Sequence, residues 1–160
     1  MPYDPAIHHR RSIRLRGFDY TRNGAYFVTI LTHRRWPLFG RVVGGVMRLS
    51  EAGWLTQAAW ADLPIHYPQV MLDAWVIMPD HVHGVLWLTG EGGGPDVAMR
   101  RHGLSEIVRA FKTFSARRIN EWRGVSGVPV WHRNYYERII RNDDALWRIR
   151  RYIAGNPTRW

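Results

Sequence analysis

The sequence predicts one α+β domain, in which helices pack on one face of an antiparallel four-stranded sheet. The chain of 160 residues is about the size of one ordinary domain with a single core. Short runs rich in β-branched and aromatic residues alternate with longer segments whose apolar residues have helical spacing. With 46% hydrophobic and 22% charged residues, the composition is that of a folded globular protein.

The first strand and the first helix follow from local composition. Residues 25–32 (AYFVTILT) are β-branched and aromatic and predict a strand. Residues 40–45 have the composition of a turn around a pair of valines. Ser50 is the expected N-cap of a helix over 51–62, and Pro64 and Pro68 are expected to end it.

The middle of the chain predicts two strands and a second helix. The strands cover 70–78 and 81–88 and are separated by Pro79-Asp80. Residues 90–95 (GEGGGP) predict a flexible loop. A helix is expected from about 106 to 122, with Ser105 as its cap.

The last third predicts a fourth strand over 130–140 and a helix from 143 to about 156, opened by Asn142 or Asp143. The resulting order is strand, helix, strand, strand, helix, strand, helix. It is typical of a ferredoxin-like sandwich with one additional C-terminal helix. We expect the second face of the sheet to be open for a ligand. We also expect two regions, a basic N-terminal arm over 1–19 and a single domain over 20–160.

Charge indicates the kind of partner. The net charge is +10 and the pI is near 11, and Lys112 is the only lysine among the basic residues. Arginine grips phosphate oxygens in pairs and stacks on bases, so a nucleic acid is the expected partner. The absence of cysteine excludes disulfides and thiolate metal sites. Neither a signal peptide nor a membrane segment is predicted, so we expect a cytoplasmic protein without a membrane partner.

The densest chemical signal is the segment MPDHVHG at 78–84. On a strand, His81 and His83 face the same side, while Val82 points into the core. Two imidazoles on one face can bind one divalent ion, although such a pair also occurs as two structural or surface histidines. Gly84 allows another group to approach the backbone closely.

The second signal lies in the last helix. Tyr152 and Asn156 are four residues apart and therefore share a helix face. A phenol with an amide one turn away suits a nucleophile beside a metal. The alternatives are a core aromatic and an ordinary helix C-terminal asparagine.

Four stretches resemble the single-tyrosine transposases of the HUH superfamily, especially the REP-associated tyrosine transposases of bacteria. They are RRSIRLRGFDYTRNGAYFVTI, WVIMPDHVHGVLWL, IVRAFKTFSARRIN and WHRNYYERIIRNDDALWRIRRYIAGNPTRW. The resemblance runs in order from about residue 10 to the C-terminus.

The resemblance implies a role for each residue. His81 and His83 would be metal ligands, Asn156 a third ligand, and Tyr152 the nucleophile that attacks hairpin-forming single-stranded DNA. Insertion-sequence members of the superfamily usually carry Gln at the position that Asn156 has in this chain. The metal would be Mg²⁺ or Mn²⁺, although Zn²⁺ also suits histidine. The implied DNA-contacting residues are Arg10, Arg11, Arg14, Arg16, Arg109, Lys112, Arg117 and Arg118.

Other residues compete for these roles. Tyr135 and Tyr136 are alternative nucleophiles, but they lie in a predicted strand and no metal-ligand type follows four residues on. His132 and His102 are alternative ligands, which we interpret as surface or DNA-contacting residues. His8 and His9 belong to the basic arm.

Two other functions are compatible with the sequence. One is a nucleic-acid-binding domain without catalysis, either a ferredoxin-like RNA binder or an inactive transposase descendant. The other is a metal-dependent hydrolase that uses water. The resemblance allows either a monomer or a homodimer.

Overall fold

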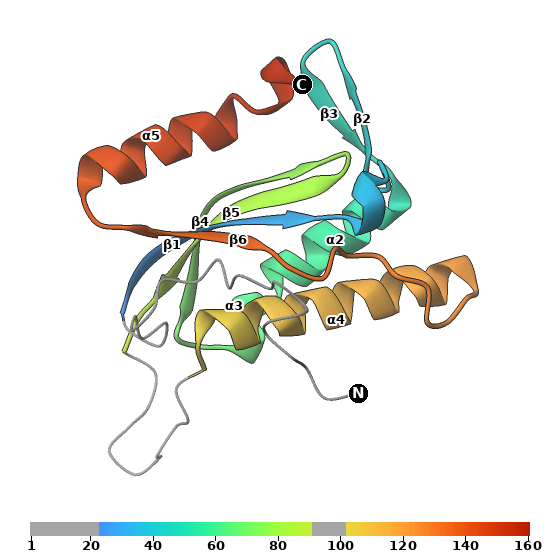
Figure 1. Cartoon of the computed structure of the whole chain (residues 1–160), viewed down its shortest axis with the longest axis horizontal. Coiled ribbons are helices and arrows are strands. Elements are labelled where there is room, and N and C mark those ends of the chain that lie inside the picture. The colour runs from blue at the N-terminus through green and yellow to red at the C-terminus, as the bar shows by residue number, and fades with distance from the viewer. Residues whose placement is uncertain (1–22, 91–101) are drawn as a thin grey trace, which may run out of the picture.

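The structure is a computed structural model, and it describes residues 23–90 and 102–160. The predicted arm at 1–19 and all but the first residue of the predicted loop at 90–95 lie outside the described residues. The described chain forms an antiparallel sheet with helices on both faces (Figure 1). Among the described residues, no helix is long and apolar enough to cross a membrane.

The main sheet confirms the predicted topology. Its strands are β1 (Gly24–Leu31), β4 (Val70–Met78), β5 (His81–Leu88) and β6 (Tyr136–Ile140). Their order across the sheet is β4-β5-β1-β6, with antiparallel neighbours. This is the ferredoxin-like arrangement, in which the chain returns between β1 and β4 through a helix. The strand β1 lies between β5 and β6 and pairs with β5 over its whole length.

The larger core lies on one face of the sheet, under α2 (Glu51–Ala61) and α4 (Leu104–Arg123). Val82, Trp60 and Phe111 are fully buried there. Val82 therefore anchors β5 as its position between the two histidines predicts. Gly84 faces the same side, where a Cβ would lie 2.2 Å from the Trp60 ring. The close approach at Gly84 thus serves core packing, not the histidine pair.

The helix α5 (Asp143–Ala154) packs on the opposite face (Figure 1). Its apolar residues Leu146, Ile149 and Ile153 form a second, smaller core with Ala25 and Val85. The expectation that this face is open is therefore wrong for the part that α5 covers, mainly on β4 and β5. The physical reason is the amphipathic pattern of α5, whose apolar side needs a sheet face to cover it.

Several predicted element boundaries change in the structure. Residues 40–49 form a hairpin, β2 (Gly40–Val43) and β3 (Val46–Leu49), where the sequence predicts only a turn. Its two-residue turn, Gly44-Gly45, has positive φ at both positions, as tight hairpins prefer. The strand β6 starts at Tyr136 instead of residue 130, and among residues 130–135 only Trp131 forms an isolated bridge, to Thr32.

The N-caps of two of the three long helices are those that the sequence predicts. Ser50 caps α2 by accepting from the Gly53 N–H, and Asn142 caps α5 by accepting from the Ala145 N–H. The helix α4 begins at Leu104 with Gly103 at the N-cap, so Ser105 is inside the helix and is not its cap. Pro64 does not end a helix but lies in the first turn of the short α3 (Leu63–His66).

One ion pair fastens α5 to the edge of the sheet. Arg150 on α5 donates from Nε and Nη2 to the Asp73 carboxylate on β4, over 2.8 and 2.6 Å. The Trp87 indole N–H donates to the same carboxylate. The hydrogen bonds from Arg150 hold the pKa of Asp73 far below its usual range and outweigh the opposing effect of burial.

The low pKa of Asp73 predicts a pH-dependent stability. Because the folded-state pKa is depressed, the stabilisation is fully present above the unfolded pKa of about 3.9 and is lost as the pH falls toward the folded value. We expect Asp73→Asn to lower the free energy of unfolding at pH 7, and the difference from wild type to narrow below about pH 4. Urea denaturation at pH 7 and at pH 3 measures this, with Glu121→Gln as a surface control. An Asp73→Asn deficit of equal size at both pH values would contradict it.

Candidate active site

The two histidines of β5 point to the same face of the sheet and lie under the end of α5. Their exposed fractions are only 7% for His81 and 6% for His83. Their ring centroids are 4.4 Å apart. The period of two along the strand thus places both rings together as predicted, in a buried position instead of on an open surface.

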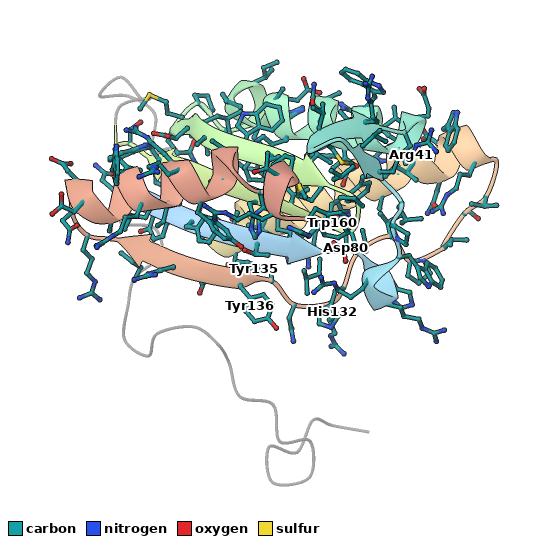
Figure 2. The ribbon with its side chains drawn as sticks, turned by 90° about the horizontal axis from the view of Figure 1, so that it is seen from above. Arg41, Asp80, His132, Tyr135, Tyr136 and Trp160 are labelled. Atoms are coloured by element: carbon teal, nitrogen blue, oxygen red, sulfur yellow. The ribbon has the colours of Figure 1, made fainter. Side chains whose placement is uncertain are left out.

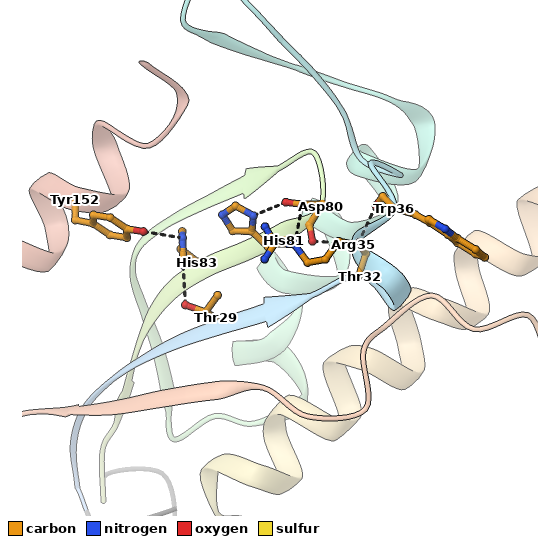
Figure 3. Close-up of polar contacts among 8 residues, drawn as sticks. All are labelled: Thr29, Thr32, Arg35, Trp36, Asp80, His81, His83 and Tyr152. Carbon is orange, nitrogen blue, oxygen red and sulfur yellow. Dashed lines mark hydrogen bonds and ion pairs between the residues drawn. The ribbon is translucent and has the colours of Figure 1, made fainter. Parts of the chain in front are cut away.

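Each imidazole is fixed through its Nδ1 atom (Figure 3). The Asp80 carboxylate lies 2.6 Å from Nδ1 of His81, and the Thr29 hydroxyl lies 2.8 Å from Nδ1 of His83. Asp80 is held in turn by the Arg35 Nε–H at 2.8 Å. The Asp80 carboxylate can only accept, so a neutral His81 donates its Nδ1–H to it and leaves Nε2 without a proton. The Thr29 hydroxyl can donate to Nδ1 of His83 or accept from it, and where it accepts, His83 also presents an Nε2 lone pair.

Arg35 belongs to a backbone segment with an uncommon conformation. Arg34 and Arg35 have φ values of 53° and 59°, in the left-handed region that residues other than glycine seldom adopt. They lie in the short turn η1 (His33–Arg35) directly after β1. Such conformations persist where the surroundings hold them, and they are frequent at functional sites. Here the turn brings the Arg35 guanidinium to Asp80.

Burial and hydrogen bonding set the charges of His83 and Asp80. Burial is the main cause that lowers the pKa of His83, to about 3. The neighbouring His81 lowers this pKa as well, and the Asp80 charge, which raises it, has the smaller effect. His83 is therefore neutral at physiological pH and keeps its lone pair. For Asp80, burial alone would raise the pKa, but the hydrogen bonds with His81 and Arg35 hold it below its usual range. Asp80 is therefore a carboxylate.

Tyr152 extends from α5 toward His83. Its hydroxyl oxygen lies 3.4 Å from His83 Nε2, the atom that the Thr29 contact leaves available (Figure 3). The Tyr152 side chain is 41% exposed, so its hydroxyl meets both the histidines and the surrounding solvent. The Phe27 ring stacks on His83 and meets Tyr152 edge-on. The Arg159 guanidinium lies 5.9 Å from the centroid of the Tyr152 ring.

Asn156 lies one turn beyond Tyr152. The helix α5 ends at Ala154, and Asn156 begins the short turn η2 (Pro157–Arg159). Asn156 is 8% exposed and its side chain does not cap η2. Within residues 23–90 and 102–160, no group of three His, Cys, Asp or Glu side chains is placed to hold a metal. A metal at the pair would therefore need amide, phenol or water oxygen beside the two imidazoles.

The two competing tyrosines face opposite sides of the sheet. Tyr135 is 9% exposed and packs in the core on the α2–α4 side, away from the histidines. Tyr136 is directly opposite Thr29, which is itself opposite His83. Directly opposite residues share a face, so Tyr136 is on the face of the pair. The Tyr152 hydroxyl, in contrast, lies within hydrogen-bonding distance of the His83 ring.

The other candidate histidines lie apart from the pair. His132 is exposed and its Nδ1 accepts from the backbone N–H of Asn134. His102 forms an ion pair with Glu106 at the start of α4. Neither belongs to the cluster around His81 and His83.

The predicted DNA-contacting residues belong either to the predicted N-terminal arm or to α4. Arg10, Arg11, Arg14 and Arg16 lie outside the described residues. Arg109 and Arg117 are exposed on α4, whereas Arg118 pairs with Asp62. Lys112 donates to the carbonyls of His132, Arg133 and Asn134, and burial lowers its pKa to about 8. Lys112 thus holds the segment before β6, and all four α4 residues belong to the layer opposite the histidines.

Sequence reasoning missed the residues that support the site. These are Thr29, Asp80, Arg35 and Arg159. Asp80 carried a signal, because it directly precedes His81 in the MPDHVHG segment. Thr29 carried none, because its partner lies 54 residues away and only the β1–β5 register brings them together.

Comparison with known proteins identifies relatives of the whole chain. No protein-family model matches the chain. An uncharacterized protein of Haemophilus influenzae is 36% identical over 173 residues, covering 99% of this chain and 93% of the relative. A second protein of that organism, described as a "Putative REP-associated tyrosine transposase", is 25% identical over 144 residues, covering 88% and 74%.

Two solved structures share the fold. A REP-associated tyrosine transposase bound to a REP hairpin superposes with a TM-score of 0.62 at 22% identity, covering 91% of this chain and 73% of that one. A "putative transposase" from Deinococcus radiodurans superposes with a TM-score of 0.51 at 22% identity, covering 89% and 95%.

The histidine pair on a central strand of a ferredoxin-like sheet, facing a tyrosine on a C-terminal helix, is the arrangement that the resemblance to the single-tyrosine transposases implies. The curated relative and the shared fold support the REP-associated tyrosine transposase branch of that class.

The Thr29 contact makes a specific prediction about the pair. Thr29→Val removes the partner of His83 Nδ1 with little change in volume, so the protein should fold while the His83 ring loses the hydrogen bond that orients it. We expect the affinity for Mn²⁺ to fall by about 10- to 100-fold, as for other partners of metal-binding histidines. Isothermal titration with Mn²⁺ measures this, with Thr113→Val on α4 as the matched control. Wild-type Mn²⁺ affinity in Thr29→Val would contradict the assignment.

Proposed function

We propose that this protein is a metal-dependent transposase that cleaves and rejoins single-stranded, hairpin-forming DNA through a covalent bond to Tyr152. The observation that carries the proposal is the position of the Tyr152 hydroxyl, 3.4 Å from Nε2 of a neutral, anchored His83. A purely structural tyrosine has no need of this placement or of 41% exposure at its position on α5.

The residues present fit a divalent cation. Two Nε2 atoms whose rings are oriented from behind by Asp80 and Thr29 form the arrangement that metal-binding histidines usually show. Asn156 is buried one turn from Tyr152 and offers an amide oxygen. Nitrogen and oxygen donors without sulfur suit Mn²⁺ or Mg²⁺. Such a cation would neutralise the scissile phosphate and orient it for attack.

The chain's own residues account for the covalent steps. The Tyr152 oxygen attacks phosphorus and loses its proton. The bond from phosphorus to the 3′-oxygen breaks, and that oxygen takes up a proton as a free 3′-hydroxyl. The 5′-phosphate stays on Tyr152 as a diester, so the energy of the broken bond is kept and a second 3′-hydroxyl can reverse the step. The Arg159 guanidinium beside the Tyr152 ring favours the negative charge that develops on this oxygen.

One chain supplies the complete site. His81, His83 and Tyr152 come from β5 and α5 of the same protomer, and the Asp73–Arg150 ion pair holds that helix on its own sheet. We therefore propose that the reaction needs no second copy. The hairpin substrate is proposed by analogy with the related transposase whose structure holds a REP hairpin.

The main competing function is binding without catalysis, and a covalent adduct separates the two. Tyr152→Phe removes one oxygen and almost no volume, so a half-exposed position should tolerate it with little loss of stability. We expect this variant to bind hairpin DNA and Mn²⁺ but to form no adduct and no nick. Labelled hairpin DNA, Mn²⁺ and a denaturing gel provide the measurement.

Tyr135→Phe and Tyr136→Phe are the matched controls and should retain adduct formation. An adduct in Tyr152→Phe would disprove the assignment of the nucleophile. Nicks without any adduct in wild type would favour the metal-dependent hydrolase that uses water.

A further inference from the structure

Beyond the part that α5 covers, the histidine face carries an exposed aromatic residue in register with the site. Tyr136, the first residue of β6, is 58% exposed. It is directly opposite Thr29, and Thr29 is directly opposite His83. Figure 2 looks onto this face and shows Tyr136 on the β6 side of β1, with α5 on the other side.

The register gives the separation between Tyr136 and the histidine pair. Neighbouring strands are about 4.8 Å apart, so the two-strand step from β5 to β6 corresponds to about 10 Å. Stacked nucleotides advance by about 3.4 Å each along one strand. Tyr136 is therefore within about three nucleotides of a phosphate held at His83.

The charges around Tyr136 favour a polyanion. Arg138, two residues along β6, is exposed, lies directly opposite Phe27, and therefore shares the face of Tyr136. The acidic residue between them, Glu137, lies opposite Val28 and faces the other side of the sheet. An exposed aromatic ring beside an arginine is the combination that binds unpaired bases and their backbone.

We propose that Tyr136 is a base-stacking platform for single-stranded DNA next to the cleavage site, and that Arg138 contacts the adjoining phosphate. This gives Tyr136 a binding role in place of the nucleophilic role considered from the sequence. The inference rests on the proposed function for the position of the scissile phosphate.

The direction of attack also indicates which side of the nick lies over Tyr136. In an in-line displacement, the leaving oxygen lies opposite the attacking one. Tyr152 approaches from α5, which packs mainly on β4 and β5, so the strand that ends in the leaving 3′-hydroxyl extends toward β1 and β6. Tyr136 accordingly stacks on a base on the 5′ side of the nick.

Binding without metal tests the platform separately from catalysis. The probe is a fluorescein-labelled hairpin with single-stranded thymine tails, and fluorescence anisotropy measures its affinity for the metal-free full chain. We expect Tyr136→Ala to weaken binding about tenfold, the loss of one stacked base, and Tyr136→Phe to bind within about twofold of wild type because stacking survives. Trp54→Ala is the matched control, because Trp54 is 56% exposed on α2 in the opposite layer.

Salt dependence and base position complete the test. Tyr136→Ala should keep the wild-type salt slope, whereas Arg138→Ala should reduce it by about 0.7, the value for one phosphate contact. On a substrate whose nick has been mapped, 2-aminopurine should be quenched by Tyr136 on the 5′ side.

Wild-type affinity in Tyr136→Ala, or equal losses in the Ala and Phe variants, would overturn the platform. Quenching confined to the 3′ side would overturn its placement. If wild type forms no adduct but Tyr136→Ala still weakens binding, the proposed chemistry fails and the platform stands.

Discussion

The two Nδ1 contacts, from Asp80 to His81 and from Thr29 to His83, are the constraint on which the site depends. Two buried imidazoles 4.4 Å apart cannot both carry a proton cheaply, and burial keeps His83 neutral. The Asp80 carboxylate then decides which nitrogen of a neutral His81 is free, and the Thr29 hydroxyl holds the His83 ring in its orientation. Because both partners belong to the sheet or to the turn that joins its strands, the sheet itself orients the Nε2 atoms.

The helix α5 adds the reactive group to this prepared surface. Its apolar side packs on β4 and β5, and the Asp73–Arg150 pair holds it at the sheet edge. This packing places Tyr152 beside His83 and leaves Tyr136 and Arg138 exposed on the same face. The helix therefore both completes the site and limits the direction from which a single strand reaches it. The opposite layer, with α2, α4 and the buried Trp60, supplies most of the core that keeps the sheet rigid.

Local patterns in the sequence predicted what depends on local geometry. The shared face of His81 and His83 follows from the period of a strand, and the caps at Ser50 and Asn142 follow from side-chain chemistry. Thr29 could not be predicted, because no local pattern encodes the register that joins it to His83. The covered half of the sheet was missed for a related reason: the amphipathic pattern of α5 shows that it packs, but not on which face.

The tautomers of His81 and His83 provide the most direct measurement of the central claim, that the sheet presents two unprotonated Nε2 atoms at the site, with that of His83 next to the Tyr152 hydroxyl. Nitrogen-15 spectra of histidine-labelled protein at neutral pH distinguish protonated from bare ring nitrogens. We expect a protonated Nδ1 and a bare Nε2 on both rings. We also expect the nitrogen-15 chemical shifts of both Nε2 atoms to change when a diamagnetic divalent cation such as Zn²⁺ is added. A proton on Nε2 of either ring, or no response of the pair to the cation, would contradict it.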